Sequence, residues 1–165
     1  MKQDNTKIYV IGGIALLAYF GFLRPILKKF GFATAGETNK VNAAETAPDN
    51  ANPFKPGYYK EVLKRRGGQP VTLKTQNGLN KIYKEFYGGF GYVYDDEAKI
   101  TGAINQLASK AQVSQFAEYV QKQTGRDIIT FMRTGINSIN AGSGLNDTEI
   151  ARIIDIVNSK PEYTK

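Results

Sequence analysis

The chain divides into an apolar N-terminal run, a polar middle segment and a C-terminal part with periodic apolar positions. Residues 8–23 (IYVIGGIALLAYFGFL) carry no charged side chain, and the run extends through Arg24 and Pro25 to Leu27. A helix of about 20 residues spans about 30 Å, which matches the hydrocarbon thickness of a bilayer. The pattern therefore predicts one transmembrane helix over about residues 8–27, within a membrane anchor of residues 1–32.

The side chains of this run suit both the apolar layer and its borders. Arg24 can keep its aliphatic stem in the apolar layer while its guanidinium reaches the head groups, and Tyr rings are enriched at membrane interfaces. The residues expected to form the anchor are Ile8, Tyr9, Leu16, Leu17, Tyr19, Phe20, Leu23 and Arg24.

Two other interpretations of the apolar run stay open. One is a buried core helix, although the next segment offers it few apolar partners. The other is a cleavable signal peptide, because Ala33-Thr34-Ala35 has the small-x-small form of a cleavage site. Lys28 and Lys29 lie between the run and that site, where a signal peptide is usually uncharged, so a retained anchor is favoured.

Residues 33–53 (ATAGETNKVNAAETAPDNANP) contain a single large aliphatic side chain, Val41, and no aromatic ring. Such a composition buries too little apolar surface to offset the entropy lost on ordering. The sequence therefore predicts a disordered, flexible linker over residues 33–53.

Residues 54–94 combine eight basic and two acidic side chains with nine aromatic rings. Residues 60–66 have the composition of a short helix, and Leu79, Ile82, Tyr83 and Phe86 fall on one face of another. The segment is suited to anionic lipid head groups or to single-stranded nucleic acid. Alternatively, the rings belong to the core and the charges are only solvated. The candidate basic contact residues are Lys60, Lys64, Arg65, Arg66, Lys81 and Lys84.

Residues 95–160 contain four amphipathic segments, each with a start signal, an apolar stripe and a stop. Ser109 with Gln112, and Asn146 with Glu149, have the spacing of a capping box. Asp127 can cap the third segment. The agreement of these signals predicts a small C-terminal helical bundle, so the expected fold class is mainly α.

The stretch DDEAKITGAINQLASKAQVSQFAEYVQKQTGRDIITFMRTGI resembles an annexin-type helical repeat over residues 89–136. Gly89-Phe90-Gly91 lies where that family has its calcium loop, but the downstream acidic ligand falls at about Gly135, which has no side chain. The resemblance implies a helical fold without calcium-dependent lipid binding. Such repeats also look similar to pieces of bacteriophage structural proteins, which suggests a virion membrane protein.

The side-chain inventory argues against catalysis and against a cofactor. The chain has no cysteine and no histidine, which removes the usual nucleophilic thiol and the usual general base. The acidic cluster at Asp95, Asp96 and Glu97 is explained by a helix start. We therefore expect a membrane-anchored structural or interaction protein without metal, cofactor or small-molecule substrate.

The expected partners are the lipid bilayer and other proteins of the same assembly, in a virion with an internal membrane or in a bacterial envelope complex. In the alternative, the protein is a tethered binding module whose basic aromatic surface engages anionic lipid, nucleic acid or cell-wall polymer.

Overall fold

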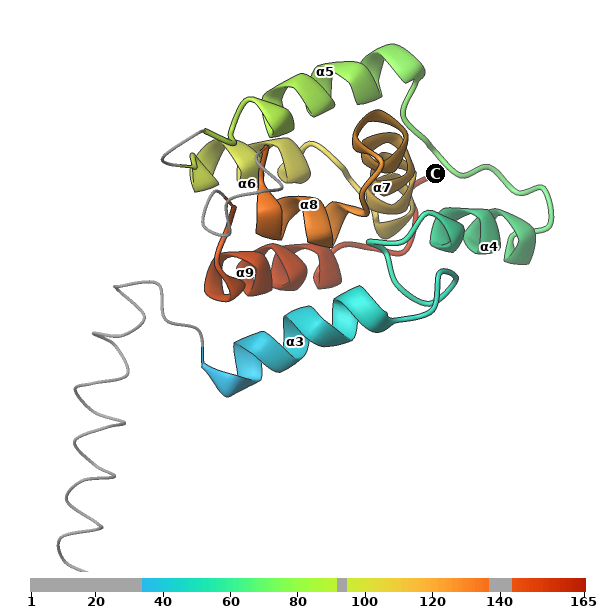
Figure 1. The fold of residues 1–165 in the computed structure, drawn as a ribbon. Coiled ribbons are helices and arrows are strands. Elements are labelled where there is room, and N and C mark those ends of the chain that lie inside the picture. Colours follow the sequence, from blue (N-terminus) through green and yellow to red (C-terminus); the bar gives the residue numbers. More distant parts are fainter. Residues whose placement is uncertain (1–33, 92–94, 137–143) are drawn as a thin grey trace, which may run out of the picture.

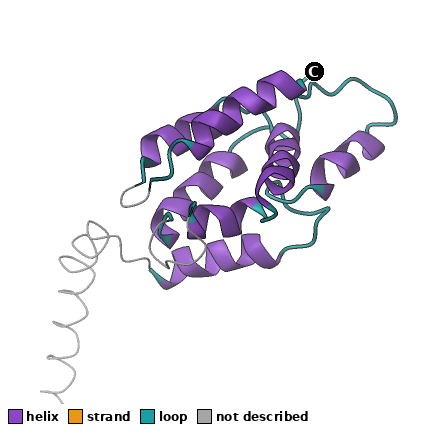
Figure 2. Cartoon of the chain, turned by 45° about the horizontal axis from the view of Figure 1, so that its top comes forward, coloured by secondary structure: helices purple, strands orange, loops and turns teal. Residues whose placement is uncertain are grey.

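The computed structural model describes residues 34–91, 95–136 and 144–165, which contain seven helices and no strand (Figures 1 and 2). The prediction of a mainly α fold is confirmed for these residues. The helices are α3 (Ala35–Thr46), α4 (Gly57–Arg65), α5 (Gln76–Tyr87), α6 (Glu97–Asn105), α7 (Lys110–Thr124), α8 (Ile128–Thr134) and α9 (Asp147–Asn158).

The predicted transmembrane helix and its anchor residues lie outside the described residues. Within the described ranges, none of the helices has the length and apolar character needed to cross a bilayer.

The predicted caps start three of the helices. Asp127 accepts hydrogen bonds from the backbone N–H groups of the first turn of α8, and Asn146 with Glu149 forms a complete capping box on α9. The Ser109 hydroxyl accepts from the backbone of Gln112 at the start of α7. The Gln112 carboxamide oxygen accepts from the backbone N–H of Ala108, however, so the capping box at α7 is only half formed.

Four phenylalanine rings hold the centre of the bundle together. Phe86 of α5 contacts Phe116 of α7 with ring centroids 5.4 Å apart, and Phe90 contacts Phe131 of α8 at 5.0 Å. All four side chains are buried, and the core continues into the aliphatic faces of α6 and α9. Edge-to-face aromatic contacts add about 0.5–1.5 kcal/mol each beyond the area they bury.

Gly89 lies where α5 ends and the chain turns toward α6. A Cβ atom at Gly89 would come within 2.5 Å of Ile100 Cγ1, so no larger residue fits without moving α6. Close packing of α5 against α6 therefore requires a glycine at position 89.

The structure differs from the sequence prediction for residues 33–53. Residues 35–46 form helix α3, whose Val41 and Ala44 are buried in the core, so the prediction of a disordered linker is wrong for this stretch. Figure 1 shows α3 lying alongside α9. The helix starts with a capping box in which the Thr34 hydroxyl and the Glu37 carboxylate each accept from the other's backbone N–H.

Polar contacts complete the attachment of α3. Lys40 forms an ion pair with Asp155 of α9 at 2.7 Å, and Glu45 pairs with Arg133 of α8 at 2.6 Å. The Thr148 hydroxyl at the start of α9 lies 3.3 Å from the Glu37 carboxylate. Glu37 contacts Thr148 at the start of α9, and Lys40, one turn further along α3, contacts Asp155, which lies further along α9. The two helices are therefore parallel, and their N-termini lie at the same end of the domain.

Val41→Ala tests whether α3 belongs to the folded domain. Truncating a fully buried valine removes two methyl groups from the core, and we expect the free energy of unfolding to fall by about 2 kcal/mol. Urea denaturation of the full chain in detergent, followed by circular dichroism, measures the loss.

The matched control for this variant is Asn39→Ser, at an exposed position of the same helix. We expect a change within about 0.5 kcal/mol for the control. Equal stabilities for the valine variant and the wild type would mean that α3 is not docked.

Candidate binding surfaces

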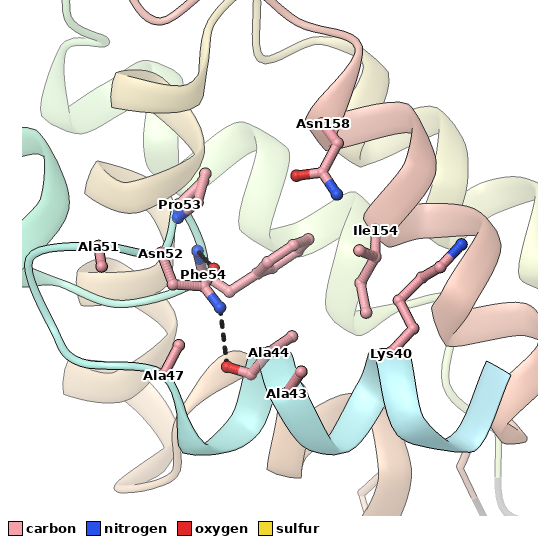
Figure 3. A pocket seen from close by; sticks show the side chains of 10 residues that line it. All are labelled: Lys40, Ala43, Ala44, Ala47, Ala51, Asn52, Pro53, Phe54, Ile154 and Asn158. Carbon is pink, nitrogen blue, oxygen red and sulfur yellow. Dashed lines mark hydrogen bonds between the residues drawn. The ribbon is translucent and has the colours of Figure 1, made fainter. Parts of the chain in front are cut away.

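A recess lies between α3, the loop that follows it, and α9. It has a volume of about 280 Å³. Figure 3 shows the side chains around it, which are Lys40, Ala43, Ala44, Ala47, Ala51, Asn52, Pro53, Phe54, Ile154 and Asn158. Asn52 shapes its wall, because its buried carboxamide donates to the Ala44 carbonyl at 2.9 Å and accepts from the Phe54 N–H at 2.8 Å.

The chemistry of this recess is suited to contact and not to reaction. Its lining is mostly methyl groups and amides, and its cation, Lys40, is engaged by Asp155. No pair of acid and base side chains faces the space. The recess can accept a small apolar side chain of another protein.

Helix α4 carries three of the six predicted basic residues, and a fourth, Arg66, is its C-cap. Figures 1 and 2 show α4 at the end of the domain that lies far from the start of α3. Lys60 pairs with Glu118 at 3.1 Å and Arg65 pairs with Glu162. The Arg66 guanidinium lies 4.3 Å from the centroid of the Tyr163 ring. Lys64 is exposed and has no ion-pair partner among the described residues.

The other two predicted basic residues lie elsewhere. Lys81 and Lys84 are exposed on α5, which packs against α6 and α7. Figure 1 shows α5 on a different side of the domain from α4. The six residues therefore do not form one continuous contact surface.

The aromatic rings of residues 54–94 are largely taken up by the fold. Phe54, Phe86 and Phe90 are buried in the core, and Tyr83 packs against Tyr119 with ring centroids 5.5 Å apart. Among the rings of residues 54–91, only Tyr87 has a large exposed fraction, 36%. The described rings thus offer few faces on which bases could stack.

The tail after α9 joins the basic end of α4 to the start of α7. The carbonyl groups of Pro161 and Glu162 accept hydrogen bonds from the first two backbone N–H groups of α7, both at 2.9 Å. The Thr164 carbonyl accepts from the N–H of Thr72 at 2.8 Å. The tail therefore caps α7 and positions Glu162 and Tyr163 beside the arginines of α4.

Two glutamine side chains of α7 hold the extended segment between α4 and α5. The Gln115 carboxamide accepts from the Lys74 N–H and donates to the Lys74 carbonyl, both at 2.8 Å. Gln112 donates to the Thr72 carbonyl at 3.1 Å. The amides take the place of a neighbouring strand, so an extended segment is stable here without a sheet.

Glu118 of α7 is the centre of a charged network beside this segment. It accepts hydrogen bonds from the Tyr59 hydroxyl and from Lys60, and it pairs with Lys122 at 3.1 Å. Burial acts to raise the pKa of Glu118, but the hydrogen bonds from these partners lower the pKa below its usual value. Burial and the bond to Glu118 raise the pKa of Tyr59 to about 12. Glu118 therefore stays ionised and ties α4 to α7.

The structure identifies residues that the sequence pattern did not. Lys110, Lys160 and the tail belong to the same end of the domain as the basic turn of α4, although they are far from it in sequence. The tail lies beyond residue 160, where the predicted bundle ended. Tyr163, two residues after Pro161, is the available signal, because a tyrosine ring gains from burial of its apolar face.

Among the described residues, no group of acidic side chains is arranged to hold a metal ion. No protein-family model, curated protein or solved structure matches this chain. The resemblance to an annexin-type repeat therefore stays a prediction.

Glu118→Gln tests the charged network through its dependence on pH. A carboxylate with a lowered pKa stabilises the fold above its usual pKa, and this stability is lost as the pH falls through the lowered value. We expect the variant to be less stable than the wild type by about 1 kcal/mol at pH 7. The difference should shrink as the pH falls below the usual pKa of a glutamate, about 4.3, as measured by urea denaturation.

Asp155→Asn is the control for this measurement. Its ion pair with Lys40 is more exposed, with 62% of the Asp155 side chain accessible, so a smaller effect is expected at pH 7. An Asp155 variant that loses more stability than the Glu118 variant would contradict the importance of the network.

Proposed function

We propose that this protein is a membrane-anchored structural or interaction protein, a minor membrane component of a virion or of a bacterial envelope complex. The observation that carries the proposal is the uncharged apolar run of residues 8–23, extended to residue 27, ahead of a polar domain. The run partitions into the bilayer, and the helical domain binds other proteins of the same assembly.

The surface of the domain supports a role in binding over a role in catalysis. The recess between α3 and α9 offers methyl groups and amides to a partner. The ionised groups described above, such as Glu118 and Arg133, hold helices together through ion pairs. We therefore propose no enzymatic activity and no cofactor.

A second candidate function is favoured by the cations at one end of the domain. In this alternative the protein is a tethered binding module for anionic lipid, nucleic acid or cell-wall polymer. The exposed Lys64 and the nearby Arg65 and Arg66 support it, because clustered basic residues attract polyanions with an affinity that falls as salt rises.

Charges placed in the apolar run test the anchor. Each charged residue near the centre of a transmembrane helix raises the free energy of insertion by about 2.5–3.5 kcal/mol. We expect the full chain to float with lipid vesicles in a density gradient, and the double variant Leu16→Arg/Leu17→Arg to lose most of this association.

Leu16→Ile/Leu17→Ile is the matched control, because it changes the same positions and keeps them apolar; it should float like the wild type. The anchor would be ruled out if the wild-type chain stayed in the soluble fraction without detergent and did not float with the vesicles.

A further inference from the structure

Five cations lie on the three segments that meet at one end of the domain, namely the end of α4, the start of α7 and the tail. This distal basic end consists of Lys64, Arg65, Arg66, Lys110 and Lys160. The hydrogen bond from the Lys110 N–H to the Pro161 carbonyl and the ion pair between Arg65 and Glu162 bring these three segments together. Residues that are almost 100 positions apart in sequence thus share one surface.

The positive charge of this end is not balanced locally. Of its acidic neighbours, Glu162 is engaged by Arg65, and Glu61 lies on α4 itself. Lys64 is exposed, whereas Lys110 and Lys160 are half-buried, and burial lowers the pKa of Lys160. None of the three lysines has an ion-pair partner in residues 34–91, 95–136 and 144–165. A nearby polyanion would therefore gain from these cations without breaking an ion pair.

The opposite end of the domain is acidic. The Glu37 carboxylate lies beside Thr148, and Glu97 pairs with Arg152 at 2.9 Å. Asp147 and Glu149 lie in the first turn of α9, and Glu97 lies in the first turn of α6. Arg133 and Arg152 pair with Asp147 and Glu97, which leaves the acidic side chains in excess at this end. Here α3, α6 and α9 all begin, and here the described chain starts at residue 34 (Figure 1).

The short connection to the predicted anchor limits which end can face the bilayer. Only residues 28–33 separate the anchor helix from Thr34, the N-cap of α3. Fully extended, this connection reaches about 25 Å. A compact domain of this size is about 35 Å across. The acidic end is therefore held toward the anchoring membrane, and the distal basic end cannot face that membrane end-on.

The composition of the distal basic end favours phosphate over a protein partner. Three of its five cations are lysines, and lysine is depleted at protein–protein interfaces but is an effective contact to phosphate. Single strands bind by stacking their bases on exposed rings. At this end the rings of Tyr58 and Tyr163 are only partly exposed, and the Tyr163 ring is already covered by the Arg66 guanidinium. A duplex, whose bases are already stacked, needs only the phosphate contacts.

We propose that the distal basic end binds the phosphate backbone of a nucleic-acid duplex and holds it about one domain width from the membrane. The binding is independent of base sequence, because lysine contacts to phosphate carry no base information. The orientation rests on the membrane anchorage proposed above, whereas the binding itself does not.

The test measures binding of a random-sequence 20-base-pair DNA duplex to the full chain in zwitterionic lipid nanodiscs by fluorescence anisotropy. About four phosphate contacts predict an affinity loss of about 100-fold between 50 and 200 mM salt. Lys64→Gln/Lys110→Gln should weaken binding at least about 10-fold at 50 mM and reduce the slope of log K against log salt by about 2.

Lys81→Gln/Lys84→Gln is the matched control, because it removes the same charge from exposed positions of α5. We expect it to retain most of the affinity. Both double variants should keep the urea midpoint of the wild type, so that lost binding is not lost folding. Equal weakening by the two double variants would overturn the assignment of the distal basic end.

Three further outcomes would overturn the proposal: no binding of the duplex at 50 mM salt, stronger binding of single-stranded DNA of the same length, and binding only to vesicles that contain anionic lipid. Failure of the membrane anchor is recognised separately. In that case the chain fails to float with vesicles but still binds the duplex in solution with the same salt dependence.

Discussion

The docking of α3 on the phenylalanine-centred core depends on one guanidinium group, that of Arg133 on α8. It lies 2.6 Å from the Glu45 carboxylate and 3.0 Å from the Asn42 carboxamide of α3, and 3.2 Å from Asp147 at the start of α9. One planar cation thus fixes three helices, which its several N–H donors make possible. The contact holds the C-terminal half of α3, whereas Glu37 and Lys40 hold its N-terminal half against α9.

Most of the bundle could be predicted from the sequence, because its signals are local. Ser109, Asp127 and Asn146 are N-caps in the structure, and Gly125 ends α7 in the left-handed conformation with φ 73°. A capping residue satisfies backbone groups of the adjacent helical turn. An apolar stripe is formed by residues only three or four positions apart. Gly88 and Gly89 likewise marked the end of α5.

Helix α3 and the surface at α4 could not be predicted in this way, because they depend on distant partners. Apart from Val41 and Ala44, α3 is attached by side chains that pair with α8 and α9, and composition alone does not reveal such pairs. The basic residues of α4 were visible in the sequence, but their neighbours in the tail were not. Whether an acidic neighbour balances a cation depends on tertiary contacts. Burial of the rings is one of three interpretations that the sequence leaves open, beside contact with anionic lipid and contact with nucleic acid.

The docking of α3 through Val41, Ala44 and its ion pairs sets how short the connection ahead of the domain is. The 12 residues of α3 are joined to the rest of the fold partly through exposed ion pairs, which high ionic strength or a competing acidic segment weakens. Pulling this helix away from α9 and unravelling it would release about 40 Å of extended polypeptide. Unfolding of α3 would then increase the distance between residue 34 and the rest of the domain, and refolding of the helix would shorten it again.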